Sequence, residues 1–181
     1  MWGRPRGEAP QLSLLSQRAQ LELLHGHGAH IDPIACVEEL SADQAAQQIP
    51  HFPHSISQLV FHMNYWMDYE LRRIRGQRPA YPEHNAESFP TSPASVDAGE
   101  WDRLRKTFAV LLAEFASLAK SPPEELQRQI ESIHPGDAKL AGTLEAVIWQ
   151  MVAHNSYHTG QIAMIRRILN AWPPQFGGDT W

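Results

Sequence analysis

The chain has 181 residues, a formal net charge of −5 and one cysteine, Cys36. This length suits a single domain with its own hydrophobic core, and one cysteine excludes an internal disulfide and suits a reducing cytosol. The acidic balance argues against nucleic-acid binding, and the sequence contains no apolar run of about 18 residues that could span a membrane. We therefore predict a cytoplasmic protein with neither a nucleic-acid nor a membrane partner.

The N-terminal part is predicted to hold one long helix and one short helix. Residues 1–9 lack the apolar run of a secretory signal and are expected to be a flexible N-terminus. Leucines then recur on a broad face over about residues 10–25, and two glycines follow, which predicts a first long helix. A short helix is expected after Ser41, which has the spacing of a capping box.

A second long helix is predicted from Ser55 to Gly76. Ser55 and Gln58 have capping-box spacing, and the glycine follows a run of arginines that suits a helix C-terminus. Apolar residues recur at helical spacing along this segment, and His62 lies within their stripe. Residues 77–96 show no clear period and predict a long crossover loop.

A third and a fourth long helix are predicted in the C-terminal half. The third follows Asp97 and runs to about Lys120, and a short helix is expected over about residues 121–132. The fourth begins near Thr143. Its apolar stripe has the alternating four-and-three spacing of a bundle seam and consists of Leu144, Ile148, Met151, Asn155, His158, Ile162, Ile165 and Leu169.

These elements predict an all-α protein, a four-helix bundle over residues 10–170 with at least one long crossover. No strand-like alternation is evident. Residues 171–181 cannot be helical, and we expect them to form an extended tail. Because exposed aromatic side chains are unfavourable, Trp172 and Trp181 are expected to pack on the bundle or on a partner subunit.

Three histidines are candidate metal ligands. His154 and His158 are four residues apart, so both imidazoles lie on one face of the fourth helix, and that face is the apolar seam. His62 points inward from the middle of the second helix. Buried imidazoles without partners would each cost about 1–3 kcal/mol. Three neutral imidazoles make an open metal site with room for water or substrate.

Polar and aromatic side chains at the same level are candidates for holding these rings or lining a pocket. The set comprises Asn155, Tyr157 and Gln161 on the fourth helix, and Asn64, Trp66 and Asp68 on the second. His30, in a glycine-flanked loop, could approach the mouth of the site. His51 and His54, beside Pro53, are expected at the surface.

Two other interpretations remain open at this point. The three histidines could be core residues whose nitrogens are satisfied by protein groups. Alternatively, Glu22-x-x-His25 and Glu131-x-x-His134 match the Glu-x-x-His motif of di-iron bundles, although both histidines stand where helices end.

The segments HSISQLVFHMNYW, HNSYHTGQIAMIRRIL and AWPPQFGGDTW resemble the DinB-like superfamily, which includes thiol-dependent S-transferases and mycothiol-dependent maleylpyruvate isomerases. The resemblance extends from about residue 10 to the end of the chain. It implies a bundle with up-down-down-up connections, a divalent metal held by His62, His154 and His158, and a homodimer.

The expected chemistry is activation of a low-molecular-weight thiol for S-transfer to an electrophilic small molecule. A metal held by three imidazoles can acidify a thiol or a water molecule, and no carboxylate stands beside the histidine pair as in H-E-x-x-H proteases. A metal-dependent hydrolase is the alternative, and a stress-associated dimer with a structural or adventitious metal is a non-enzymatic one. Three imidazoles accept zinc, nickel or iron.

Overall fold

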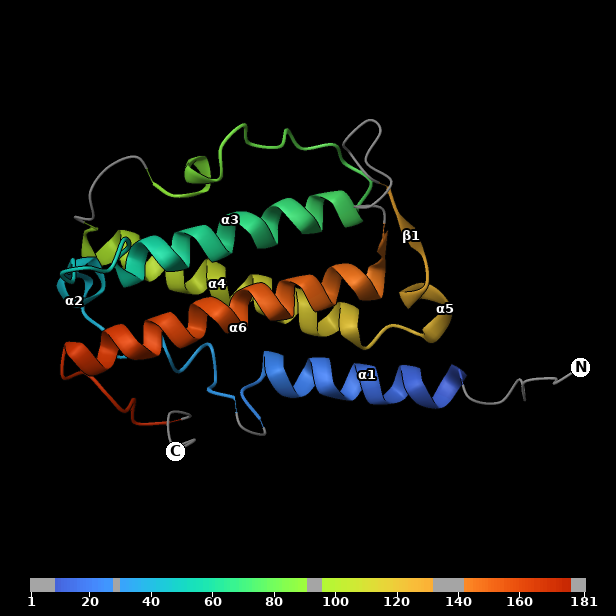
Figure 1. The fold of residues 1–181 in the computed structure, drawn as a ribbon, viewed down its shortest axis with the longest axis horizontal. Coiled ribbons are helices and arrows are strands. Elements are labelled where there is room, and N and C mark those ends of the chain that lie inside the picture. Colours follow the sequence, from blue (N-terminus) through green and yellow to red (C-terminus); the bar gives the residue numbers. More distant parts are fainter. Residues whose placement is uncertain (1–8, 28–29, 91–95, 132–141, 177–181) are drawn as a thin grey trace, which may run out of the picture.

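Four long helices form the body of the protein. The computed structural model describes residues 9–27, 30–90, 96–131 and 142–176. The four helices of the bundle (Figure 1) are α1 (Ala9–Leu24), α3 (Ile56–Ile74), α4 (Ala98–Ala119) and α6 (Leu144–Ile168). The predicted all-α class is confirmed.

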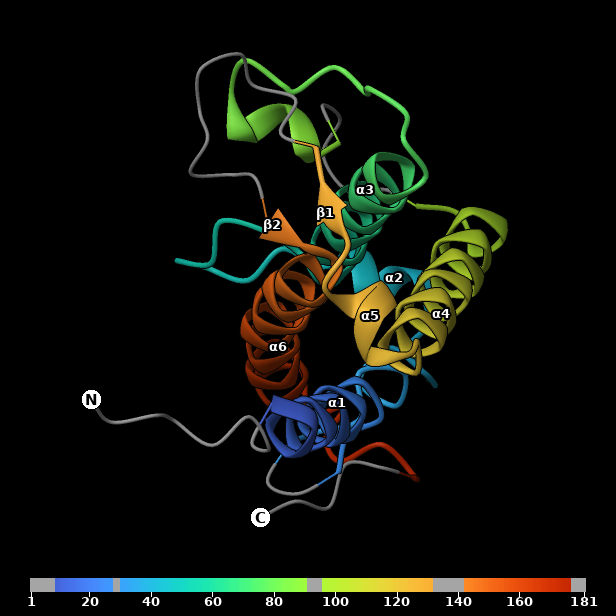
Figure 2. The ribbon, with the colours of Figure 1, turned by 90° about the vertical axis from the view of Figure 1, so that its right-hand side faces the viewer.

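The helices follow one another around the bundle in the order α3, α4, α1 and α6, as the end-on view in Figure 2 shows. Each helix packs against the two beside it. In Figure 1, α3 and α4 run in one direction, and α1 and α6 run in the other. The segment that connects α3 to α4 crosses the length of the bundle and contains a short 3-10 helix, η1 (Asn85–Ser88).

The starts of the helices are those that local chemistry predicts. Ser55 caps α3 with a complete capping box to Gln58, and Thr143 caps α6 by accepting a hydrogen bond from the backbone N–H of Ala146. The short helix α2 (Ala42–Ala46) begins with a second capping box at Ser41. The predicted starts of these three helices are confirmed to within two residues.

The connection between α4 and α6 differs from the prediction. The short helix α5 (Pro123–Leu126) ends well before residue 132, and the chain continues as β1 (Gln129–Ile130), which pairs antiparallel with β2 (Gly142–Thr143). Strands of two residues are too short to show alternation, and their pairing depends on a partner distant in sequence. Local pattern could therefore not reveal them.

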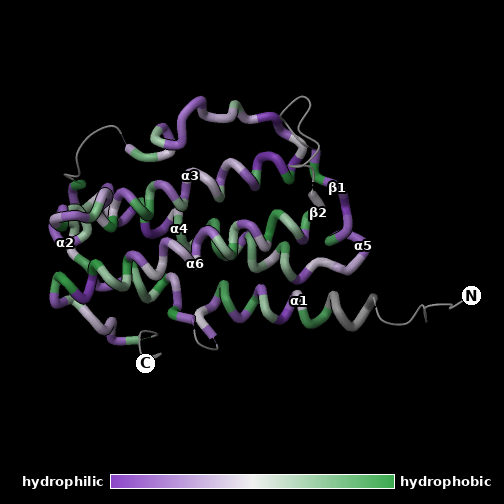
Figure 3. Tube along the Cα trace, in the orientation of Figure 1, coloured by the Kyte–Doolittle hydropathy of each residue, from purple (hydrophilic) through white to green (hydrophobic). Residues whose placement is uncertain are grey.

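The predicted seam of α6 faces the core. Its members from Leu144 to Ile165 are all buried, whereas Leu169 is half-buried. Figure 3 shows apolar and polar residues alternating along the helices, as expected of amphipathic helices that share one core. Within the described residues, no helix is both long enough and apolar enough to span a membrane.

The residues that follow α6 return toward the bundle. Trp172 is half-buried against the core, and the guanidinium of Arg167 lies 4.4 Å from the centre of its ring. Trp181 lies outside the described residues. The division into an N-terminal segment, a bundle and a tail stays a prediction.

Candidate metal centre

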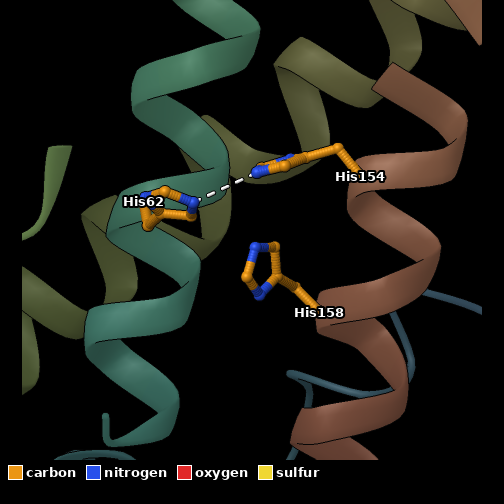
Figure 4. A group of neighbouring side chains, drawn as sticks. All are labelled: His62, His154 and His158. Atoms are coloured by element: carbon orange, nitrogen blue, oxygen red, sulfur yellow. Dashed lines mark hydrogen bonds between the residues drawn. The ribbon is translucent and has the colours of Figure 1, made fainter. Parts of the chain in front are cut away.

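The three histidines singled out in the sequence come together between α3 and α6. His62 on α3 faces His154 and His158 on α6, and all three rings enter the space between the two helices (Figure 4). One ligand atom from each ring can be chosen so that all three lie within 4.8 Å of one another. His62 and His158 are each 7% exposed, and His154 is half-buried.

The packing of two neighbouring helices creates this arrangement. His154 and His158 are one helical turn apart, so their rings project from the same face of α6. That face packs against α3, where His62 lies at the same level. Residues separated by 92 positions in the sequence thereby approach to hydrogen-bonding distance.

The Nδ1 atom of His62 is protonated, because its partner can only accept. The hydroxyl of Ser88 donates its one proton to the carbonyl of Asn85, at 2.5 Å. The same oxygen lies 2.8 Å from Nδ1 of His62 and therefore accepts the ring's N–H. In the neutral ring, Nε2 of His62 then carries a lone pair.

The other two rings are held in the same way by amide oxygens. Nδ1 of His158 lies 2.7 Å from Oε1 of Gln161, and Nδ1 of His154 lies 3.3 Å from Oδ1 of Asn155. The amide nitrogen of Asn155 donates to the sulfur of Met67, which assigns its oxygen to the histidine side. Both rings therefore also donate from Nδ1 and have a lone pair on Nε2.

These protonation states leave two lone pairs facing each other. Nε2 of His62 and Nε2 of His154 are 3.1 Å apart, the contact drawn as a dashed line in Figure 4; rings that are protonated at Nδ1 have no proton on Nε2 to donate in it. Two nitrogens bound to one tetrahedral zinc ion would be separated by roughly 3.3 Å. The donor set of three neutral imidazoles, each oriented through its second nitrogen, fits a divalent ion of the zinc, nickel or iron type.

Burial keeps the imidazoles neutral. Burial, together with the nearby imidazoles of His158, His154 and His54, lowers the pKa of His62 to about 3. Burial also lowers the pKa of His158 to about 4, and it lowers the pKa of His154. Because a metal binds the neutral ring, the three side chains are in the state that a ligand requires.

An aromatic stack covers the outer face of His62. The ring of Phe89 lies parallel to His62, with ring centres 4.0 Å apart, and His54 stacks on Phe89 at 3.8 Å. Trp66, a predicted pocket residue, approaches His62 edge-on at 6.4 Å. The expectation that His54 is an ordinary surface residue is wrong, because it is half-buried in this stack.

Ser88 and Phe89 were missed by the sequence analysis. Both lie in the crossover segment, which has no period that would place a side chain against a particular helix. The one available signal was the spacing of His84 and Glu87, which form the capping box of η1 and indicate a local turn in the crossover segment.

Other predicted companions of the site lie elsewhere. Asn64 donates a hydrogen bond to the carbonyl of Leu104 and therefore faces α4, and Asp68 borders a groove on the same side. His30 is hydrogen-bonded to the carbonyl of its neighbour Ile31, at 2.7 Å, and is not part of the histidine group.

The di-iron interpretation gains no support. Glu22 pairs with Arg18 at an exposed position, and Glu131 pairs with Arg78, while His134 lies outside the described residues. In the part of the chain that the structure describes, His62, His154 and His158 form the one group of three or more such donors whose ligand atoms converge.

Comparison with known proteins gives one family. A family model described as the DinB superfamily matches residues 34–162, which is more than half of the chain and includes all three histidines. It also includes Ser88, Asn155 and Gln161, whose oxygens accept from the rings. No curated protein matches the chain.

Proposed function

The chain belongs to the DinB superfamily, and we propose that it is a metal-dependent enzyme in which His62, His154 and His158 hold one divalent ion. The observation that carries this proposal is the set of Nδ1 contacts. Each ring donates its Nδ1–H to an oxygen and turns an unprotonated Nε2 toward the others. Histidines that served only as core residues would have both nitrogens satisfied by protein groups.

We further propose that the reaction is the transfer of a low-molecular-weight thiol to an electrophilic small molecule. A divalent ion held by His62, His154 and His158 would lower the pKa of a thiol or water molecule bound to it. The residues of the chain keep the three rings neutral and oriented through Ser88, Asn155 and Gln161. In the net reaction, the sulfur–carbon bond forms, the leaving group departs with its electron pair, and the thiol proton is released to solvent.

The absence of a carboxylate among the groups that act on the histidines favours S-transfer over hydrolysis. Among the described residues, histidine neighbours, Ser88, Asn155 and Gln161 account for every contact that shifts the pKa of these three rings. Activated water in a metalloprotease relies on a glutamate as general base, whereas a thiol is acidic enough to ionise once its pKa is lowered by a cation. A thiol substrate therefore needs no further base from the chain.

Metal analysis combined with turnover tests the proposal. The purified chain would be loaded with zinc, nickel or iron(II) and assayed with cysteine or mycothiol and an aryl halide as model electrophile. We expect the His158→Ala variant to lose both the bound metal and turnover, and the His25→Ala variant, altered at an exposed histidine, to retain both.

Three outcomes separate the alternatives. Full thiol transfer after complete removal of metal would contradict the proposal. Ester hydrolysis without thiol, dependent on metal and on His158, would instead indicate a hydrolase. A bound metal that raises the melting temperature, with neither reaction detected, would indicate a structural ion.

A further inference from the structure

A groove lies between α3 and α4, whereas the three histidines lie between α3 and α6. The groove has a volume of about 380 Å³, which is within the range of small-molecule pockets. We call it the α3–α4 groove. It is lined by Phe61, Asn64, Tyr65 and Asp68 of α3 and by Glu100, Arg103, Leu104 and Thr107 of α4.

The spacing of the lining residues explains how the groove forms. On each helix they follow the intervals i, i+3, i+4 and i+7, which describe one helix face. The two helices pack side by side and run in the same direction (Figures 1 and 2). The amide nitrogen of Asn64 donates to the carbonyl of Leu104 at 3.0 Å, and this contact sets the two faces level with each other.

The amide oxygen of Asn64 is a buried acceptor without a partner. Asn64 is 7% exposed and is the most buried of the lining residues. Because the carbonyl of Leu104 can only accept, it assigns the amide nitrogen to its own side. In the part of the chain that the structure describes, Oδ1 accepts no hydrogen bond. Such groups are rare in native proteins, so a ligand that donates a hydrogen bond fits this position.

The charges around the α3–α4 groove differ between its two ends. Glu100 lies at one end, where Arg103 offsets its charge: Nη1 of Arg103 is 3.6 Å from the position of a Cβ on Gly99, so the guanidinium turns back toward the start of α4. Asp68 lies at the other end, about 12 Å away along the helices. Its ion pair with Arg72 is long, at 3.9 Å, and 56% of the Asp68 side chain is exposed.

The end of the groove at Asp68 favours a cationic donor. Asn64 and Asp68 are one turn apart on the same face of α3, so one ammonium group can contact both. Tyr65 also lines the groove, and its aromatic ring attracts cations. An anion would instead meet a carboxylate and an unpaired amide oxygen, neither of which can donate a hydrogen bond to it.

We propose that the α3–α4 groove binds a small organic amine, with the ammonium group held between Asn64 and Asp68. The apolar body of the amine lies against Phe61, Tyr65 and Leu104. The site is separate from the histidine group, and the proposal depends neither on a bound metal nor on thiol transfer.

Three ligands of similar shape test the requirement for a positive charge. Phenethylamine carries the ammonium group, phenylethanol is its neutral counterpart and phenylpropionate its anionic one. In titrations of the isotope-labelled full chain followed by amide NMR shifts, we expect phenethylamine to bind about tenfold more tightly than the other two. The largest shifts should occur over residues 61–68 and 100–107. Equal affinities for the amine and the alcohol would overturn the proposal.

Removal of one carboxylate tests the position of the ammonium group. Asp68→Asn should weaken the binding of phenethylamine by about tenfold and leave that of phenylethanol unchanged. Glu124→Gln is the matched control, because it removes an exposed carboxylate on α5, away from the groove, and it should bind the amine as the parent does. An Asp68→Asn variant that binds phenethylamine as tightly as the parent would contradict the proposal.

Two further variants test the location without depending on Asp68. Asn64→Leu should weaken amine binding; because it alters a buried residue, Thr107→Trp provides a second test. Thr107 is exposed, so the larger ring should leave the helical circular dichroism unchanged, fill the groove and abolish binding. His158→Ala should bind the amine as the parent does. Binding that is lost in His158→Ala and retained in Thr107→Trp would place the amine at the histidines and overturn the proposal.

Discussion

Arg166 on α6 and the three histidines between α3 and α6 are two groups of side-chain nitrogens inside the bundle with opposite surroundings. Arg166 is 2% exposed, yet its guanidinium donates to four backbone carbonyls, those of Ala35, Cys36 and Glu38 through Nη1 and that of Ala171 through Nε. The three histidines donate only from Nδ1, and their Nε2 atoms face one another. Backbone carbonyls satisfy the Nε and Nη1 donors of Arg166. The histidines use Nδ1 as donor and keep an acceptor on Nε2 that has no protein donor.

This difference separates a structural role from a functional one. The carbonyls around Arg166 belong to the loop before α2 and to Ala171, three residues after the end of α6, so the arginine connects these two segments to the helix. A buried acceptor without a donor costs about 1–3 kcal/mol. An ion bound between the three rings would supply a partner for these acceptors and would offset that cost, as expected of a binding site.

The largest predicted effect is the loss of folding stability on substitution of Arg166. The Arg166→Met variant should lower the free energy of unfolding by about 3–5 kcal/mol, because it strands several buried carbonyls at once. Metal bound per chain should not change. Urea unfolding and elemental analysis measure the two quantities. Arg167→Met, at the exposed neighbouring position, should cost less than about 1 kcal/mol; equal losses for the two variants would show that the carbonyl contacts do not distinguish them.

The metal-free protein should lose stability as the pH falls, and the histidines should be the cause. Their pKa values in the folded chain, about 3 for His62 and about 4 for His158, lie below the ordinary 6.5. The unfolded state therefore takes up protons first. Between about pH 7.5 and pH 5.5 each of these two histidines should remove about 1.4 kcal/mol from the free energy of unfolding.

Unfolding curves of the metal-free chain at several pH values measure this loss. The double variant His62→Gln, His158→Gln should lose most of the pH dependence, whereas Arg166→Met should keep it, because a guanidinium does not titrate in this range. A parent chain equally stable at both ends of the interval would contradict the neutral state assigned to the rings.

Ser88→Ala should weaken metal binding by about tenfold or more, because the ring of His62 loses the acceptor that orients it. Competition against a chelating dye measures the affinity. Ser57→Ala is the control: Ser57 is also buried, but its hydroxyl contacts Ser55 and no imidazole. If both variants bind metal as the parent does, the contact of Ser88 with His62 has no part in the site.

The smallest predicted effect is a change in metal affinity on substitution of Gln161. Two different substitutions there should change the affinity in opposite directions. Gln161→Glu places a carboxylate on Nδ1 of His158, which should strengthen the ligand and tighten metal binding severalfold, by about 1 kcal/mol or less. Gln161→Leu removes the acceptor and should weaken binding. Shifts in the same direction for both substitutions would show that Gln161 does not act through the hydrogen bond to His158.

The parts of the site that lie on long helices could be predicted, and those on the crossover could not. His62, His154 and His158 occupy seam positions of two amphipathic helices, so periodicity alone placed them inward. Asn155 and Gln161 followed from their spacing to the histidine pair. Ser88 and Phe89 lie where the chain has no period, and only the packing of that segment on α3 sets them beside His62. Asn64 was predicted to lie beside the histidines, but it faces α4. Its position on α3 indicates burial and does not show which helix it contacts.

Local chemistry in the sequence accounts for the helices, their caps and the inward direction of the three histidines. These features depend on contacts within a few residues, which the amino-acid order determines directly. The tertiary structure decided which helices are neighbours, which oxygens accept from the imidazoles, and that the Nε2 atoms converge. Those features depend on contacts between residues far apart in the chain, and their distances are settled only when the bundle packs.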